Sequence, residues 1–373
     1  MAIKPLFLYI LLLLLLSTCV KPYYPTINKY ERVIVIDGLL TDDGTPPLVN
    51  ISYSSSLKGS NPEKVAGALV YILTSEGQKF NLTETSQGSY TYTQSMFHVV
   101  IGSSYQLVVE HEGHVFKSTM EKLLPSSPIT DISFQMKSDN KGVDLFISTK
   151  DIDSASRYYV WRLTETWKFR SPLFSPVKSI NKEICYATTI DDLKLGSTDL
   201  FSQNRFNRFQ FLDIPTSSPK LFYRYSILVD QLSISRSSYI YLNYVIKTNE
   251  TGGSLFDPIP TNMNGNINSE NQPVIGNFQV SSLTSKRIYI DRSDLPSTVM
   301  ISNGMEDCKL EMIGLGGGVQ KRMRDSLERF MIIMDTISDI NGTFVRFTTR
   351  ERCFDCTATG SPNTPPSWWK EKK

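Results

Sequence analysis

The stretch that decides the fold is Val33-Ile34-Val35-Ile36-Asp37-Gly38-Leu39-Leu40-Thr41. A β-branched run opens it, an Asp-Gly pair follows, and a second apolar run leads into the turn-rich segment Asp42-Asp43-Gly44-Thr45-Pro46-Pro47. β-Branched residues favour strands, whereas Asp, Gly and Pro favour turns. The pattern therefore predicts a strand, a break at Asp37-Gly38, a second strand and a turn.

The next segments of the chain repeat this strand-and-turn pattern. Val49, Ile51 and Tyr53 alternate with polar residues, and further strands are predicted at 68–74 and from 88 onward. A hairpin is predicted where the two-residue turn Glu112-Gly113 separates apolar segments. Short strands at this spacing are typical of an Ig-like antiparallel β-sandwich of about 100 residues. We place this domain at residues 33–123.

A second β-rich, sandwich-like domain with a few helices is predicted over residues 129–373. The Pro- and Ser-rich segment 124–128 reads as a linker. After it, residues 143–147 alternate in hydrophobicity, and Tyr158–Leu163 and Tyr223–Val229 are rich in β-formers. The fold class predicted for the whole chain is thus mainly β.

Two segments of this second domain carry a helical pattern. Residues 235–247 fit either a strand or a helix capped by Ser235. Near the C-terminus, apolar residues at helical spacing predict an amphipathic helix that ends near Asn341-Gly342. The apolar positions of that helix are Met323, Leu327, Phe330, Met331 and Met334.

The N-terminus resembles an export signal. Lys4 precedes an unbroken apolar run, Leu6–Leu16, which is too short to cross a hydrocarbon core of about 30 Å. The run ends in Leu16-Ser17-Thr18-Cys19, the lipobox pattern of bacterial lipoproteins. We therefore predict a signal peptide at 1–18, lipidation of Cys19 and a tether at 19–32. The alternative is an ordinary secretory signal with a chance cysteine.

Four further cysteines lie in the predicted second domain: Cys185, Cys308, Cys353 and Cys356. In an oxidising envelope, four cysteines predict two disulfides, for which three pairings are possible. A redox pair at Cys353-Phe354-Asp355-Cys356 and a four-cysteine zinc site are the alternatives. We favour structural disulfides that hold the C-terminal tail.

Composition and motifs indicate a binding protein rather than an enzyme. Lys and Arg total 39 and Asp and Glu total 37, so no excess of basic charge is available to bind nucleic acid. His111 and His114 should face each other across the hairpin, and Glu165 lies between Trp161 and Trp167 in the sequence. Neither set forms a recognisable catalytic or metal motif. We predict no catalytic residues, no metal and no cofactor.

A set of short blocks, in order along the chain, carries a family resemblance. The blocks begin at Cys19-Val-Lys-Pro-Tyr-Tyr-Pro and continue with Val35–Thr41, Tyr158–Trp161, Glu165–Trp167, Tyr225–Gln231, Leu255–Pro260, Gly265–Ile267, Ile275–Phe278 and Cys353–Cys356 with Gly360, Pro366 and Trp368. In these blocks the chain resembles the Bacteroidota outer-membrane lipoproteins that carry the domain of unknown function numbered 4249. Their tail usually reads Pro-Asp/Glu-Phe-Trp, whereas this chain has Pro366-Ser367-Trp368-Trp369.

The resemblance implies location and partners more than activity. It implies a lipid-anchored accessory subunit on an outer-membrane β-barrel, either a TonB-dependent transporter or an assembly complex, for cargo capture or complex assembly. It favours a helix at 235–247, and the N-terminal sandwich also resembles carboxypeptidase-regulatory-like modules. In some of these lipoproteins an acidic run after the lipidated cysteine is the signal for export to the cell surface. No such run follows Cys19, so the resemblance does not select the surface or the periplasmic face of the outer membrane.

The alternative function is a stand-alone surface lipoprotein that binds a glycan or peptide. Aromatic rings that stack on a ligand would carry such binding. The candidates are Trp161, Trp167, Trp368 and Trp369.

Overall fold

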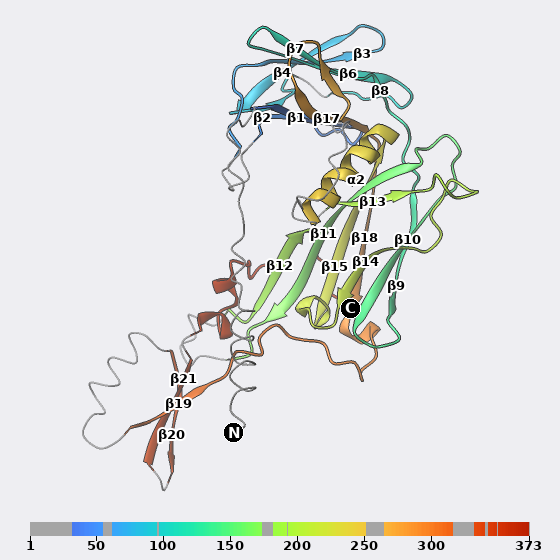
Figure 1. The fold of residues 1–373 in the computed structure, drawn as a ribbon. Coiled ribbons are helices and arrows are strands. Elements are labelled where there is room, and N and C mark those ends of the chain that lie inside the picture. Colours follow the sequence, from blue (N-terminus) through green and yellow to red (C-terminus); the bar gives the residue numbers. More distant parts are fainter. Residues whose placement is uncertain are drawn as a thin grey trace, which may run out of the picture.

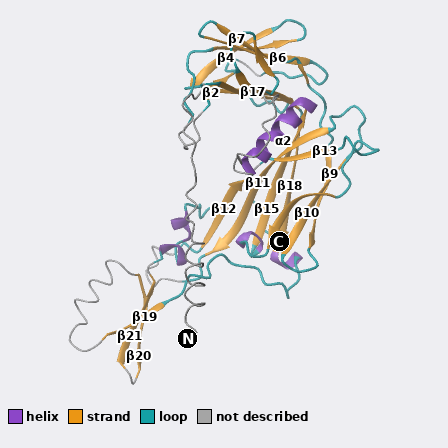
Figure 2. Cartoon of the chain, in the orientation of Figure 1, coloured by secondary structure: helices purple, strands orange, loops and turns teal. Residues whose placement is uncertain are grey.

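The computed structural model describes residues 32–54, 62–94, 97–173, 182–191, 193–250, 265–315, 332–339, 342–348 and 350–372. Figures 1 and 2 show a strand-rich unit at the top, a second strand-rich unit beneath it, and the helix α2 (Arg236–Glu250) between them. A smaller three-stranded sheet lies at the lower left (Figure 1). The predicted mainly β fold is confirmed.

The upper unit, or upper sandwich, has ten strands, nine of which follow one hydrogen-bonded path. The order is β16-β7-β6-β3-β4-β5-β2-β1-β17, with β8 paired to β6. Its apolar core includes Ile36, Val70, Leu107 and Phe278, all buried. The strands are β1 (Ile34–Thr41), β2 (Leu48–Tyr53), β3 (Leu69–Thr74), β4 (Lys79–Ser86), β5 (Ser89–Thr91), β6 (Ser104–His111), β7 (His114–Ser118), β8 (Glu121–Lys122), β16 (Ile267–Ser269) and β17 (Val274–Ser281).

The predicted break at Asp37-Gly38 is wrong, because β1 runs without interruption through both residues. Gly38 lies directly against the core. A Cβ atom at this position would stand 2.9 Å from a ring carbon of Phe278 and 3.1 Å from Leu107. Glycine is therefore present for a close approach of side chains to the backbone and does not end the strand. The predicted hairpin is confirmed. His111 pairs with His114 across the turn Glu112-Gly113, and both turn residues have positive φ.

Two strands of the upper sandwich come from outside the range 33–123. β17 pairs in parallel with β1 over its whole length, and β16 pairs with β7. The predicted second domain, 129–373, thus contributes part of the first core. β17 then continues through the single residue Ser282 into β18 (Leu283–Asp291) of the lower unit. Backbone and hydroxyl hydrogen bonds join Ser282 to Ser233, so the two units share a short, well-bonded joint.

The lower unit, or lower sandwich, packs two sheets face to face. One sheet has the order β14-β10-β9, and the other has the order β12-β11-β15-β18, with β13 also paired to β11. Their shared core contains Leu145, Trp161, Leu163, Ile227 and Val229, all fully buried. The strands are β9 (Ile129–Met136), β10 (Gly142–Thr149), β11 (Tyr158–Arg170), β12 (Ile184–Ile190), β13 (Lys194–Ser197), β14 (Phe209–Pro215), β15 (Arg224–Ile234) and β18.

Helix α2 covers the other face of the larger sheet, close to the upper sandwich. The Ser235 Oγ accepts a hydrogen bond from the Ser238 backbone N–H, as an N-cap does. Leu242 then packs on Val160 and Leu232. The helix predicted for 235–247 is confirmed. The helix is stable here because its apolar face packs against the sheet.

The C-terminal region differs from prediction. β19 (Glu311–Leu315), β21 (Gly342–Thr348) and β20 (Ile332–Asp339) form a three-stranded sheet. The predicted helix through Met334 is therefore wrong over residues 332–339, and its first part, 323–331, lies outside the described residues. Short 3-10 turns complete the fold: η2 (Pro219–Leu221), η3 (Arg292–Asp294), η4 (Glu351–Cys353) and η5 (Cys356–Thr359).

Candidate functional site

A buried charged cluster lies near the end of β11 that is remote from α2. Glu165 points into the lower sandwich and is fully buried. Its carboxylate accepts a hydrogen bond of 2.6 Å from the Lys220 ammonium and another from the Tyr225 hydroxyl. Lys220 stands in η2, where Ser218 caps the turn, and its side chain is 23% exposed. The cluster is thus closed on the Glu165 side and reaches solvent at Lys220.

Burial governs the ionisation of this cluster. Desolvation raises the pKa of Glu165, and a hydrogen bond shared with Asp191 raises it further, while Lys220 and Tyr225 act in the opposite direction. The pKa of Tyr225 is raised well above its ordinary value by burial and by the neighbouring Glu165 charge. Lys220 and Tyr225 therefore stabilise the charged form of Glu165 against the cost of burial, whereas Asp191 does not. No substrate can reach this carboxylate without displacing them.

An apolar pocket of about 270 Å³ lies next to the cluster. Trp167 lines it and also lies under the Lys220 ammonium, which is 5.6 Å from the ring centroid. Phe169, Ala187, Pro219 and Met305 complete the apolar lining, and Thr359 and Ser361 add hydroxyl groups. The pocket is thus formed by β11, β12 and η2 together with the later segments around Met305 and Thr359.

Two disulfides fix those later segments. Cys185 of β12 bonds to Cys356, and Cys308 bonds to Cys353, so each half of the Cys353–Cys356 motif is tied to a distant cysteine. The prediction of two disulfides is confirmed, and the structure selects this pairing among the three. Cys185 and Cys356 are fully buried beside Phe169.

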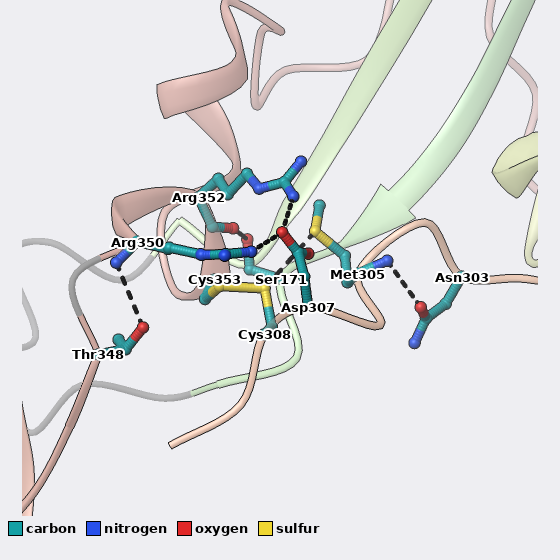
Figure 3. The surroundings of a disulfide bond; sticks show 9 residues. All are labelled: Ser171, Asn303, Met305, Asp307, Cys308, Thr348, Arg350, Arg352 and Cys353. Atoms are coloured by element: carbon teal, nitrogen blue, oxygen red, sulfur yellow. Dashed lines mark hydrogen bonds and ion pairs between the residues drawn. A yellow bond between two sulfur atoms is a disulfide. The ribbon is translucent and has the colours of Figure 1, made fainter. Parts of the chain in front are cut away.

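Ion pairs surround the second disulfide. Figure 3 shows Arg350 and Arg352 both directed at the Asp307 carboxylate, next to Cys308. The Ser171 hydroxyl, which follows β11, donates to the Arg352 backbone carbonyl over 2.8 Å. The C-terminal segment is therefore held to the lower sandwich by covalent, ionic and hydrogen bonds together.

The tail after η5 lies on the larger sheet. The Tyr289 hydroxyl donates to the Trp368 carbonyl, and the Arg287 guanidinium stacks 3.5 Å from the Trp368 ring centroid. The Trp369 ring meets Tyr186 and Tyr289 edge to face. Both tryptophans are half-buried, and their rings contact residues of the chain itself.

The predicted ligand-stacking residues do not form one surface. Trp161 is wrong as a stacking residue, because it is fully buried and its indole N–H donates to Gln231. Trp167 borders the apolar pocket, and Trp368 and Trp369 lie together in the tail. Cys19 lies outside the described residues. No group of three or more metal-ligating side chains occurs among the residues that the structure describes.

Sequence reasoning missed several residues of this end of the molecule. Lys220 gave no signal, because nothing local links η2 to Glu165. Met300 is 92% exposed in the segment that closes the lower sandwich, although its neighbours Val299 and Ile301 are buried in the core. In the sequence, the three are consecutive apolar residues, and an extended segment must point the middle one away from its neighbours; this is the signal that could have found Met300.

The fold and the site together define a two-sandwich β protein whose C-terminal segment is fastened by disulfides. The family model described as Domain of unknown function (DUF4249) matches residues 20–287, and the chain belongs to this family. No protein with a curated description matches the chain. Within the described part of the chain, no helix has the length and hydrophobicity needed to span a membrane.

Proposed function

We propose that this protein is a non-enzymatic outer-membrane lipoprotein, anchored through Cys19, that docks on an outer-membrane β-barrel. The barrel is a TonB-dependent transporter or an assembly complex, and the chain assists cargo capture or assembly. The lipobox and the short apolar run before it support export and lipidation. Several acyl chains on one cysteine provide stable anchoring.

The observation that carries the proposal is the pairing of all four described cysteines in disulfides. Disulfides persist in oxidising compartments such as the bacterial envelope. Both bonds brace the same end of the lower sandwich, where Phe169 of β11 packs beside Cys185 and Cys308. We call this the braced end. Exposed apolar side chains, Met300 and Tyr223, lie at this braced end. A rigid surface with apolar anchors is what a stable protein interface requires.

The buried cluster supports a non-catalytic role. Glu165 is fully enclosed, and its oxygens are occupied by Lys220 and Tyr225. A catalytic carboxylate has to reach its substrate. We therefore assign the cluster to the stability and alignment of the braced end.

The test is affinity purification of the tagged protein from its own envelope in detergent, followed by mass spectrometry. A barrel protein in stoichiometric amount is expected, and its absence would refute the docking function. Met300→Glu should reduce its recovery. Leu200→Glu is the matched control, because Leu200 is 96% exposed after β13, at the opposite end of β11. Equal recovery with both variants would remove the braced end as the docking surface.

The anchor is tested separately. Cys19→Ala should abolish labelling by a radioactive fatty acid and release the protein from the membrane fraction. Retention of the label in this variant would exclude Cys19 as the lipidated residue.

A further inference from the structure

Two adjoining depressions lie at one end of the upper sandwich, beside the β6–β7 hairpin. One has a volume of about 260 Å³ and the other about 510 Å³, and His114 lines both. Together they reach the size of ordinary ligand sites, about 300–1,000 Å³. They lie in the other unit from the braced end, so a ligand bound here would be independent of the docking function.

The smaller depression is mainly polar. Ile34 and Phe116 line it, but both belong to the buried core and expose little of their side chains. The Tyr53 hydroxyl lies 3.5 Å from the His111 Nε2. The Arg32 guanidinium covers the Tyr53 ring at 3.6 Å from its centroid. This lining fits a ligand that forms hydrogen bonds.

The larger depression combines polar and apolar groups, and the exposed Val115 side chain is among the apolar ones. It follows β16 and the residues after it, with side-chain amides from Asn268 and Asn271 and a hydroxyl from Ser269. At the border with the smaller depression, the Gln272 side chain lies 3.3 Å from the His114 Nε2. Amides and hydroxyls both donate and accept hydrogen bonds. These groups suit a ligand that also both donates and accepts hydrogen bonds.

The charges of the lining cancel. Arg32 and Lys117 are the cations, and Glu112 and Glu270 are the carboxylates. Arg32 already forms an ion pair with Glu63, so it is not free to bind an anion. A site for an anion would carry an excess of positive charge. The balance therefore favours an uncharged ligand.

We propose that these two depressions form one groove that binds a neutral, polyhydroxylated ligand, a short oligosaccharide. A sugar C–H face packs on the exposed Val115 side chain, and sugar hydroxyls bond to the amides of Asn268, Asn271 and Gln272. Trp161, Trp368 and Trp369 take no part in this site.

The test is an array of neutral and acidic oligosaccharides probed with the full-length lipoprotein in a detergent without a sugar headgroup. A neutral oligosaccharide is expected to bind, and its affinity is then measured by calorimetry. Asn268→Ala and Gln272→Ala should each weaken it by about 3- to 10-fold, the loss of one hydrogen bond. Asn81→Ala is the control, because Asn81 is an exposed asparagine on β4, away from β7 and β16 in the sheet.

Three outcomes would overturn the proposal. They are no binding on the array, binding restricted to acidic sugars, and an affinity that the two groove variants leave unchanged. All variant positions are exposed, so unfolding should not intervene, and an unchanged thermal midpoint checks this. Failure here leaves the docking function intact, since that function predicts a co-purifying barrel and not a sugar.

Discussion

At the scale of single residues, Gly38 shows how a core contact overrides a local turn preference. Gly38→Ala would place a methyl group 2.9 Å from Phe278. Overpacking of this kind costs about 1–3 kcal/mol. We expect the free energy of unfolding, measured by urea titration, to fall by that amount.

Asn81→Ala on β4 is the control for this prediction, because an exposed substitution should change stability by less than about 0.5 kcal/mol. A Gly38→Ala protein as stable as this control would mean that the core has free space beside β1.

Glu165 provides a prediction about pH. Its pKa in the folded protein is raised above the ordinary value of 4.5, so the folded state holds this proton more tightly than the unfolded chain. Stability must then fall as the pH rises from about 4.5 through the folded pKa, and level off above it. Glu165→Gln should remove this part of the pH dependence of the unfolding free energy.

The paired measurement is urea unfolding of both proteins from pH 4 to pH 8. The difference in stability between wild type and Glu165→Gln should change in favour of the variant as the pH rises. A difference that stays constant would show that Lys220 and Tyr225 balance burial, and one that changes in favour of the wild type would show that they outweigh it.

Residue types alone did not reveal which aromatic rings are accessible. In β11, Trp161 and Val160 are both buried, because one face of the strand packs on the β9–β10–β14 sheet and the other meets α2. Alternation of apolar and polar residues predicts accessible positions only for a strand with one solvent-exposed face. The prediction of two disulfides succeeded because cysteine count and compartment are enough to make it, whereas the pairing requires the fold.

At the scale of elements, the upper sandwich depends on a strand from far along the chain. β17 pairs with all eight residues of β1 and places Phe278 in the core. A fragment of residues 32–124 would expose the edge of β1. We expect that fragment to aggregate or stay unfolded, as judged by gel filtration and circular dichroism.

Joining residues 265–281 to that fragment through a flexible linker should restore cooperative unfolding. The same joined fragment with Phe278→Asp is the control and should not fold, because it would bury a charge in the core. Cooperative unfolding of 32–124 by itself would show that β17 is dispensable.

The elements also show where sequence patterns are ambiguous. Short strands and the Glu112-Gly113 hairpin were predictable, because their signals are local. The pairing of β1 with β17 has no local signal at all. The C-terminal segment was misjudged because Asn341-Gly342 fits both the end of a helix and a hairpin turn. The β-branched residues Ile332, Ile333, Thr336 and Ile337 carry the information that favours a strand and hence the hairpin.

At the scale of the whole molecule, the chain holds its two units together by returning to each of them. It leaves the upper sandwich at β8, builds most of the lower one, returns through α2 to supply β16 and β17, and re-enters the lower sandwich at β18 (Figure 1). The Cys185–Cys356 disulfide then fastens the C-terminal segment to β12, and the Cys308–Cys353 disulfide fastens it to the segment after β18. This topology separates the proposed groove, at one end of the upper sandwich, from the braced end of the lower one.

The two disulfides should contribute unequally to global stability. A cross-link stabilises mainly by restricting the unfolded chain, and more so for a longer loop. The Cys185–Cys356 loop has a sequence separation of 171 and the Cys308–Cys353 loop one of 45, which correspond to about 5 and about 4 kcal/mol. Replacing Cys185 and Cys356 by Ala should therefore lower the unfolding free energy more than replacing Cys308 and Cys353. The reverse order in urea titrations would mean that folded-state contacts outweigh chain entropy, and the ion pairs of Asp307 are the contacts that would then explain it.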